Sequence, residues 1–443
     1  MTTARTPSPS PSPSREASLI LIGLVLGGLA GVTLNALYSP VQGGTPSAAY
    51  ERTLWIADNL ANPAGQIFLR MLFMVVVPLV FCSIFLGVSG LGNLEKLGRI
   101  GTRTLLWFVL TTAFAATIGL TLVNVARPGA RMDPEVSARV REEFKGAALE
   151  TMEQAKGGTG FSVATFVNII PRNFLRSASS ERETLGVIFF ALVFGIASTM
   201  LEKKITQPLI DVLQAVYDLC VRVLGFAMKL APVGVAGLIF SVTAKLGFDV
   251  LASLLQFVVV AIAGLLIHQF LVLGVLVRVF VGISPWSFFR RCRTLFITAF
   301  STSSSSATLP TTIRTAVEEF GAPPDVARFV IPLGATMNMN GTALFEGVTV
   351  LFLAQVAGVE LGLVSQLIVV VLAVLTAIGA AGVAGGSLPL LAVVLAQVGV
   401  PPDMLALVLG VDRIIDMTRT VPNVTSDLVA TLFVARRGGY EIR

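Results

Sequence analysis

The chain has 443 residues, of which 54% are hydrophobic and 13% are charged, and its mean hydropathy is +0.83. A soluble globular domain carries about twice that share of charged residues, so the composition excludes an ordinary soluble protein and indicates a membrane protein. The formal net charge of +6 comes from short basic connections between apolar segments, and it therefore does not require a nucleic-acid partner.

The chain begins with a tail, residues 1–16, that we expect to be disordered and cytoplasmic. Residues 6–14 read Thr-Pro-Ser-Pro-Ser-Pro-Ser-Pro-Ser, a composition typical of extended, unpacked chain. The apolar run that follows is long and has no small-residue cleavage pattern, so this region does not have the pattern of a signal peptide.

Apolar segments recur along the chain, and most of them exceed the ~20 residues that a helix needs to cross a bilayer. They are 17–39, 66–91, 101–126, 185–200, 208–243, 250–282, 328–356, 361–397 and 404–435. Because these runs are continuous rather than alternating, we predict an all-α membrane protein and not a transmembrane barrel.

Basic residues cluster in the short connections, and the positive-inside rule places such clusters on the cytoplasmic side. They are Lys96, Arg99, Arg103, Lys203, Lys204, Arg290, Arg291, Arg293, Arg436, Arg437 and Arg443. With Arg5 and Arg15, they predict that both termini are cytoplasmic. Residues 127–184 form the longest polar stretch, which we interpret as an external loop.

The three cysteines and the single histidine give weaker signals. Cys82, Cys220 and Cys292 show neither pairing nor metal-binding spacing, so we expect no disulfide framework. His268 lies inside an apolar segment, where it is either a packed residue or a proton relay. Its sequence neighbours offer no partner, and this favours packing.

Two tips rich in small residues interrupt the second half of the chain. Residues 301–310 read Ser-Thr-Ser-Ser-Ser-Ser-Ala-Thr-Leu-Pro, and residues 379–389 read Gly-Ala-Ala-Gly-Val-Ala-Gly-Gly-Ser-Leu-Pro. Both have apolar flanks, and both end in a hydroxyl residue, Leu and Pro. Irregular backbone at membrane depth is tolerated only where it is buried in protein or lines a cavity. Helix ends at such tips suit a transporter's anion site; the alternative is two flexible external loops.

Between the two tips, residues 332–344 read Pro-Leu-Gly-Ala-Thr-Met-Asn-Met-Asn-Gly-Thr-Ala-Leu. The glycines and amides favour an unwound segment within an apolar helix. Its freed carbonyls, with the Asn and Thr oxygens, suit a hard cation such as Na⁺. The alternative is a kink that only packs.

A polar stripe runs along the last apolar segment. Asp412, Asp416, Arg419, Asn423 and Asp427 are separated by four, three, four and four residues, which places them on one side of a helix. Each charge near the bilayer centre costs roughly 2.5–3.5 kcal/mol on insertion scales. The stripe predicts a watery or ligand-filled interior; the alternative is a buried ion pair that locks two helices together.

These motifs together resemble the dicarboxylate/amino acid:cation symporter family, which includes the excitatory glutamate transporters. The segments that carry the resemblance are 303–310, 338–342, 379–387 and 416–427, with 68–78 and 111–115 similar to the family's second and third spans. The resemblance covers nearly the whole chain after residue 16.

The resemblance implies eight spanning helices, two re-entrant hairpins and a homotrimer in the inner (plasma) membrane, working by an elevator mechanism. A transport domain slides past a trimerisation scaffold, and the second hairpin is the gate. The implied divisions are 17–65 (first span and external loop of the scaffold), 66–126 (spans two and three), 127–184 (external loop), 185–249 (scaffold spans four and five) and 250–443 (transport domain). The last contains span six, hairpin one (285–321), span seven (328–356), hairpin two (361–397) and span eight (404–435).

The resemblance also implies the binding residues. Asp416 would hold a substrate ammonium group, and Arg419 would hold the side-chain carboxylate as a bidentate partner. The remaining substrate residues are Ser303, Ser305, Thr342, Val383, Thr420 and Asn423. One Na⁺ site would use Asp427 with Gly334, Asn338 and Asn423, and a second would use Thr336 with Ala377, Ile378 and Ala380. No other cofactor is expected.

Two departures from the family pattern bear on coupling and selectivity. The family commonly has Asp where this chain has Asn340, so a third Na⁺ site with Thr111 and Thr112 is in doubt. The family also places an extra arginine where this chain has Ser303 or Met417. Arg413 could replace it, and the sequence leaves this open.

The leading hypothesis is a Na⁺-coupled symporter of glutamate or aspartate. The alternatives are a proton-coupled glutamate/aspartate carrier, a C4-dicarboxylate symporter or an anion channel. A membrane enzyme is disfavoured, because the serine run has no His or Lys nearby to activate a nucleophile.

Overall fold

The computed structural model describes residues 13–39, 47–89, 94–132, 138, 142, 170–179, 184–380, 382–383 and 385–443. Within these ranges every regular element is a helix, as expected for a membrane chain made of continuous apolar runs. Most of the predicted 127–184 loop, and residues 1–12 of the predicted tail, lie outside the described residues.

The N-terminal half contains long helices whose bounds follow the apolar segments. They are α1 (Pro13–Tyr38), α2 (Ala48–Ile56), η1 (Ala57–Ala61), α3 (Asn62–Phe73), α4 (Val76–Ser89), α5 (Leu94–Ala126), α9 (Phe174–Ala178), α10 (Thr184–Thr199) and α11 (Lys203–Leu246). Helix α1 begins at Pro13, so the end of the predicted tail is helical.

The C-terminal half is more interrupted. Its elements are α12 (Asp249–Leu266), η2 (Ile267–Val272), α13 (Leu273–Leu276), η3 (Val277–Val281), α14 (Pro285–Arg291), α15 (Arg293–Thr302), α16 (Ser305–Arg314), η4 (Thr315–Glu319), α17 (Pro324–Met337), α18 (Asn340–Ala357), α19 (Leu363–Gly379), α20 (Leu388–Gln397), η5 (Pro402–Met404) and α21 (Leu405–Arg437). The helix breaks fall at the two tips and in the Asn-Met-Asn segment, where the sequence predicted irregular backbone.

Six helical segments of the described chain are long and apolar enough to cross a membrane. They are Ser18–Tyr38, Ala48–Ser89, Gly101–Ala126, Lys203–Leu246, Leu251–Val281 and Pro324–Ala357. Shorter apolar helices occur at Gly186–Thr199, Leu363–Ile378 and Leu388–Gln397. The described helices confirm the prediction of an all-α chain, and these segments are consistent with a multi-pass membrane protein.

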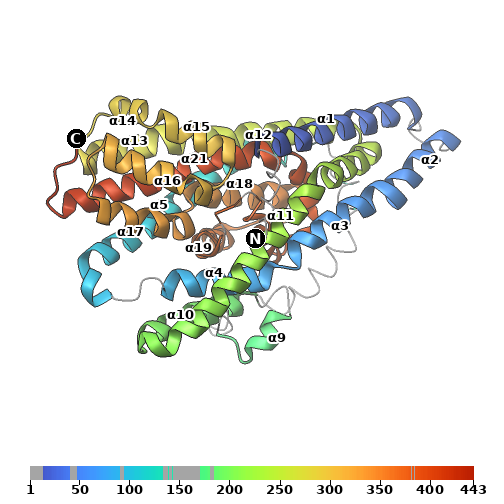
Figure 1. Ribbon diagram of the computed structural model, residues 1–443. Helices are drawn as coiled ribbons and strands as arrows, with labels where there is room; N and C mark the ends of the chain where they lie inside the picture. The colour runs from blue at the N-terminus through green and yellow to red at the C-terminus, as the bar shows by residue number, and fades with distance from the viewer. Residues whose placement is uncertain are drawn as a thin grey trace, which may run out of the picture.

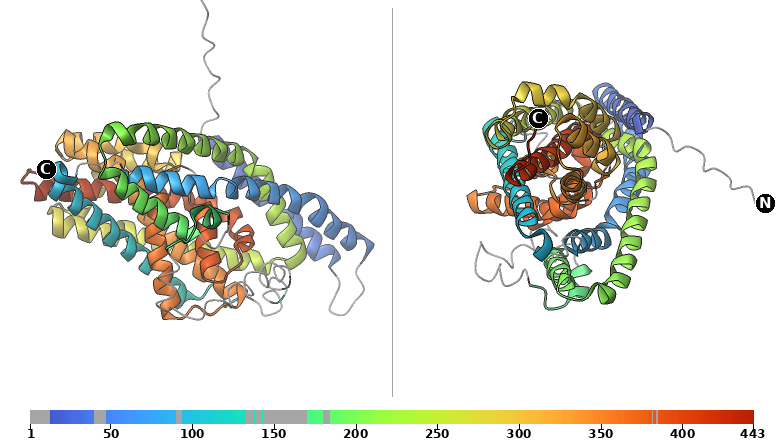
Figure 2. Two further views of the ribbon diagram at one scale, coloured as in Figure 1. Left: turned by 90° about the horizontal axis from the view of Figure 1, so that it is seen from below. Right: turned by 60° about the vertical axis from the view of Figure 1, so that its left-hand side comes forward.

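Helix α21 lies in the interior of the molecule, with α11 on one side of it and α5 on the other (Figures 1 and 2). It packs against α17, α18, α15, α12 and α11. Its first half joins an apolar cluster through Leu407, Val408 and Ile415, and its second half joins another through Val424 and Leu428. The polar stripe is therefore enclosed by protein.

Helix α1 packs closely on α11 through a row of small residues. Gly23, Gly27 and Gly31 are four residues apart, so they share one face of α1. A Cβ atom at Gly27 would collide with the Ala236 carbonyl oxygen and lie 2.9 Å from Ile239 Cγ2. Close helix approach through small residues is typical of membrane helices.

We expect Gly27→Ala to lower the apparent melting temperature of the detergent-purified protein, because overpacking a tight contact costs about 1–3 kcal/mol. Gly28→Ala is the matched control, since a Cβ atom at Gly28 has its nearest neighbours at 3.8 and 3.9 Å. Equal melting temperatures for the two variants would contradict the packing described here.

Candidate functional site

A pocket lies where the two tips, the α17–α18 break and α21 meet. Its lining residues are Ser303, Ser305, Met339, Thr342, Gly382, Val383, Ser387, Asp416, Arg419, Thr420 and Asn423. The lining includes all eight residues that the resemblance assigns to the substrate. The structure thus brings them together, and their binding of substrate stays a prediction.

The first tip presents the start of α16 to the pocket. Helix α15 ends at Thr302, and Ser303 adopts a left-handed conformation with φ of 50°. Ser304 then caps α16, because its Oγ accepts a hydrogen bond of 3.1 Å from the Ala307 N–H. The positive end of α16 therefore faces the pocket, where it favours an anion.

The second tip touches both the first tip and α21. The Gly382 carbonyl accepts hydrogen bonds from the Ser306 N–H at 3.0 Å and from the Ser304 hydroxyl at 2.6 Å. The Gly385 N–H donates to Asp416 Oδ2 at 3.3 Å. A Cβ atom at Gly382 would lie 2.9 Å from the Ala335 carbonyl oxygen and 2.6 Å from Ser306 Oγ, so this close approach of the backbone favours glycine. The second tip thus covers the pocket.

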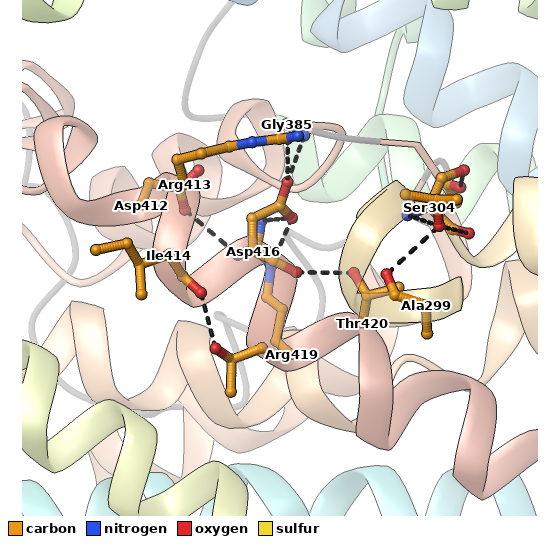
Figure 3. Close-up of polar contacts among 12 residues, drawn as sticks. Ala299, Ser304, Gly385, Asp412, Arg413, Ile414, Asp416, Arg419 and Thr420 are labelled. Atoms are coloured by element: carbon orange, nitrogen blue, oxygen red, sulfur yellow. Dashed lines mark hydrogen bonds and ion pairs between the residues drawn. The ribbon is translucent and has the colours of Figure 1, made fainter. Parts of the chain in front are cut away.

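The four charged residues in the first half of α21 pair with one another (Figure 3). Arg419 donates to Asp416 Oδ1 through Nε at 3.0 Å and Nη2 at 2.7 Å, and its Nη1 lies 3.6 Å from Asp412 Oδ1. The guanidinium also stacks over the Phe345 ring, 4.5 Å from its centroid. The ion pairs of the stripe seen in the described residues all lie within α21. The alternative of a pair that locks two helices together therefore has no support in these contacts.

The α17–α18 break is held by α21. The Asn423 side-chain oxygen accepts hydrogen bonds from the Gly341 N–H at 2.7 Å and the Thr342 N–H at 3.4 Å, and so caps the start of α18. Its amide group donates to the Thr342 hydroxyl at 3.2 Å. The break is therefore stabilised by specific polar contacts from the stripe and is more than a packing kink.

Asp427 is a buried carboxylate beside the break, with 1% of its surface exposed. Asn338 Nδ2 donates to its Oδ1 at 2.9 Å, and Gly334 lies against its side chain. No ion pair to Asp427 occurs within the described residues, and a buried carboxylate without a cation is costly. The structure thus places Gly334 and Asn338 against the Asp427 side chain, and Asn423 lies one helical turn before Asp427 on α21.

The residues predicted for the second Na⁺ site lie near the other side of the break. Ala377 and Ala380 share an apolar cluster with Met339, and α19 packs against α17. Thr336 directs its hydroxyl to the Leu333 carbonyl at 3.0 Å within α17. Ile378 packs in a neighbouring cluster. The last carbonyls of α19 have no partner within that helix, and they are the groups that the prediction requires.

The residues of the doubtful third site form a closed hydrogen-bond network. The Thr112 hydroxyl donates to Asn340 Oδ1 at 2.8 Å, and Asn340 Nδ2 donates to Ser426 Oγ at 2.8 Å. Asn340 Nδ2 also lies 3.3 Å from His268 Nε2. Thr111 donates to Asn338 Oδ1 at 3.3 Å. The network therefore joins α5, η2, α18 and α21.

Sequence reasoning missed two members of this region. The sequence neighbours of His268 offer no partner, yet its side chain is fully buried against Asn340. Glu346 is also fully buried; one of its oxygens accepts the Thr376 hydroxyl at 2.6 Å, and the other has no hydrogen-bond partner in the described structure. Glu346 lies four residues after Thr342, so helical spacing could have found it. No spacing rule connects His268 to Asn340, because they lie on different helices.

Comparisons with known proteins agree with this architecture. A family model described as the sodium:dicarboxylate symporter family matches residues 17–437. The chain is similar to the proton/glutamate-aspartate symporter of Escherichia coli (strain K12), with 35% identity over 86% of each chain. It is also similar to the proton/sodium-glutamate symport protein of Bacillus subtilis (strain 168), with 33% identity over 96% of this chain and 92% of the relative. The C4-dicarboxylate transport protein of Laribacter hongkongensis (strain HLHK9) is 33% identical over 85% and 83% of the two chains. The resemblance found in the sequence is confirmed: the chain belongs to the sodium:dicarboxylate symporter family.

Proposed function

We propose that this protein is a secondary active symporter that carries an acidic amino acid, glutamate or aspartate, into the cell together with Na⁺. The observation that carries the proposal is the opposite charge of Asp416 and Arg419 within one buried pocket beneath a helix N-terminus. The names of two similar relatives, which specify glutamate or aspartate symport, support the same substrate class.

In this proposal, substrate binding replaces the internal ion pair by two pairs with the substrate. Asp416 takes the ammonium group and Arg419 takes the side-chain carboxylate, so no buried charge is left without a partner. The α-carboxylate binds between the two tips, at the start of α16, with Ser303, Ser305 and Val383. The other polar residues of the lining, Thr342, Thr420 and Asn423, complete the contacts.

The tips that cover the pocket support a gate at the second hairpin. In this proposal the gate opens by loss of the Gly382 and Gly385 contacts, since both cross from the second tip to other elements. We propose that 250–443 is the transport domain of an elevator-type homotrimer with eight spans and two re-entrant hairpins. The inner membrane, with both termini cytoplasmic, is the proposed location.

Sodium coupling is supported by the buried charge of Asp427. One Na⁺ would bind beside this carboxylate, with the oxygens of Gly334, Asn338 and Asn423. The second would bind between Thr336 and the end of α19 at Ala377, Ile378 and Ala380. In both sites the ligands are oxygen atoms, which suit a hard cation such as Na⁺.

A proton-coupled carrier is the alternative, and Glu346 is the observation that favours it. A buried carboxyl group with one unpartnered oxygen can exist in a neutral, proton-carrying form. A C4-dicarboxylate carrier is disfavoured, because Asp416 would face a substrate that has no ammonium group. A site built to pair with a charged or hydrogen-bonding group discriminates strongly against a substrate that lacks that group.

Uptake of labelled L-glutamate and L-aspartate into proteoliposomes tests the proposal. We expect accumulation under an inward Na⁺ gradient and little competition by succinate. Accumulation that ignores Na⁺ and follows a pH gradient would establish the proton-coupled alternative. Current far in excess of coupled uptake would instead indicate a channel.

We expect Arg419→Cys to abolish the preference for acidic over neutral amino acids, because the variant lacks the cation that binds the side-chain carboxylate. The measurement is competition of glutamate and serine for uptake or exchange in proteoliposomes. Arg314→Cys, at an exposed ion pair with Glu318, controls for loss of an arginine. If Arg419→Cys still prefers glutamate over serine, the assigned role of Arg419 is wrong.

Coupling through two Na⁺ sites, without a third, is supported by the closed network around Asn340. Its amide already has partners for its oxygen and its nitrogen, and it lacks the negative charge that attracts a cation. We expect Asn340→Asp to steepen the Na⁺ dependence of substrate binding and to lower the half-activating Na⁺ concentration about three- to tenfold. Asn124→Asp, which adds the same charge at an exposed position, is the control. Identical Na⁺ curves for Asn340→Asp and the native protein would show that position 340 has no part in coupling.

A further inference from the structure

Four charged residues lie within two turns of α21, and all are buried. The exposed fractions of Asp412, Arg413, Asp416 and Arg419 are 6%, 5%, 4% and 2%. The two acids and two bases cancel, so the cluster is neutral as long as Arg413 is present. Because buried charge is strongly destabilised when it is unmatched, the neutrality of this cluster depends on all four residues.

Arg413 contacts the cluster from outside the pocket lining. Its Nη1 lies 3.5 Å from Asp416 Oδ2, the oxygen that also accepts the Gly385 N–H (Figure 3). Arg419 binds the other oxygen, Oδ1. The Asp416 carboxylate is therefore shared between two guanidinium groups, one that lines the pocket and one that does not.

The contacts of Arg413 indicate that its charge matters more than its hydrogen bonding or its bulk. Its Nε and Nη1 have no hydrogen-bond partner within the described residues, although the side chain is buried. Unsatisfied buried donors cost stability, and an apolar side chain would fill the same space without this cost. The attraction to Asp416 is the one contact of these donors that offsets it.

We infer that Arg413 is a positioning residue that keeps Arg419 available to the carboxylate of the substrate. This inference rests on the proposed function. Arg419 faces two acids, Asp416 at 2.7 Å and Asp412 at 3.6 Å. Arg413 attracts Asp416 from its other side and balances the second negative charge. Without Arg413 the cluster carries a net negative charge, which repels an anionic substrate and holds Arg419 to the protein's own acids.

The inference predicts the effect of removing and restoring the charge balance in the full-length protein. In proteoliposomes, Arg413→Gln raises KM for L-glutamate and L-aspartate about tenfold, equivalent to about 1.4 kcal/mol, with a smaller change in kcat. Adding Asp412→Asn to Arg413→Gln removes one acid and returns KM toward the native value. Arg413→Lys keeps KM near native, because a single attraction at 3.5 Å does not need the planar guanidinium fork.

The controls separate this role from a structural one. Arg314→Gln, at the exposed pair with Glu318, leaves KM unchanged. If Arg413→Gln and the double variant have equally raised KM values, or if Arg413→Gln has a native KM, the inference is overturned. If Arg413→Gln does not fold, the single variant Asp412→Asn tests the inference instead. We expect it to free Arg419 and to lower KM for L-glutamate and L-aspartate. A KM equal to or above the native value overturns the inference. A native protein that transports no acidic amino acid refutes the proposed function itself.

Discussion

The Asp416–Arg419 ion pair is the interaction on which the arrangement of the rest of the molecule depends. Two opposite charges of this kind are tolerated at membrane depth only when protein groups replace the water that they lose. Helix α21 therefore occupies the interior, and the two tips and the α17–α18 break converge on it. Each of these irregular segments would be costly in lipid, and each is stabilised here by polar groups of the others.

The polar stripe of α21 changes character along its length. Its first part, from Asp412 to Arg419, consists of charges that pair within the helix. Its second part uses neutral or singly charged groups to hold other elements: Asn423 caps α18, and Asp427 binds Asn338. In the proposed function, this division places the ligands for an amino acid and the ligands for cations on one helix. Movement of α21 would consequently carry both kinds of site together.

Helical spacing predicted much of this site, because its main features are local. The stripe, the two tips and the Asn-Met-Asn break can each be recognised within about 25 residues of sequence, and the structure brings them together. The composition likewise predicted a helical membrane protein. The family resemblance supplied the identity of individual lining residues, such as Ser305 and Val383, whereas the hydrogen bonds of Asn423 to the break come from the structure alone.

The remaining features depend on distances between segments far apart in the chain. His268 meets Asn340, and Glu346 meets Thr376, only because particular helices pack side by side. The sequence also did not show which charged residues pair with which, because a helical stripe shows which residues share a face and not which rotamers they adopt. Arg413 lies off the centre of the stripe, yet its long side chain reaches back to Asp416.

The contacts of the second tip set a limit on how firmly the pocket is closed. The Ser304, Ser306 and Gly385 hydrogen bonds cross from that tip to its neighbours, and none of the three joins two ionised groups. Two of them join neutral groups, at about 1 kcal/mol each, and the third, to a carboxylate, contributes about 2 kcal/mol. On these polar contacts alone, a conformer without them is populated on the order of 0.1% of the time. The empty pocket would therefore sample an open form spontaneously, and a solute could enter without first having to force the tip aside.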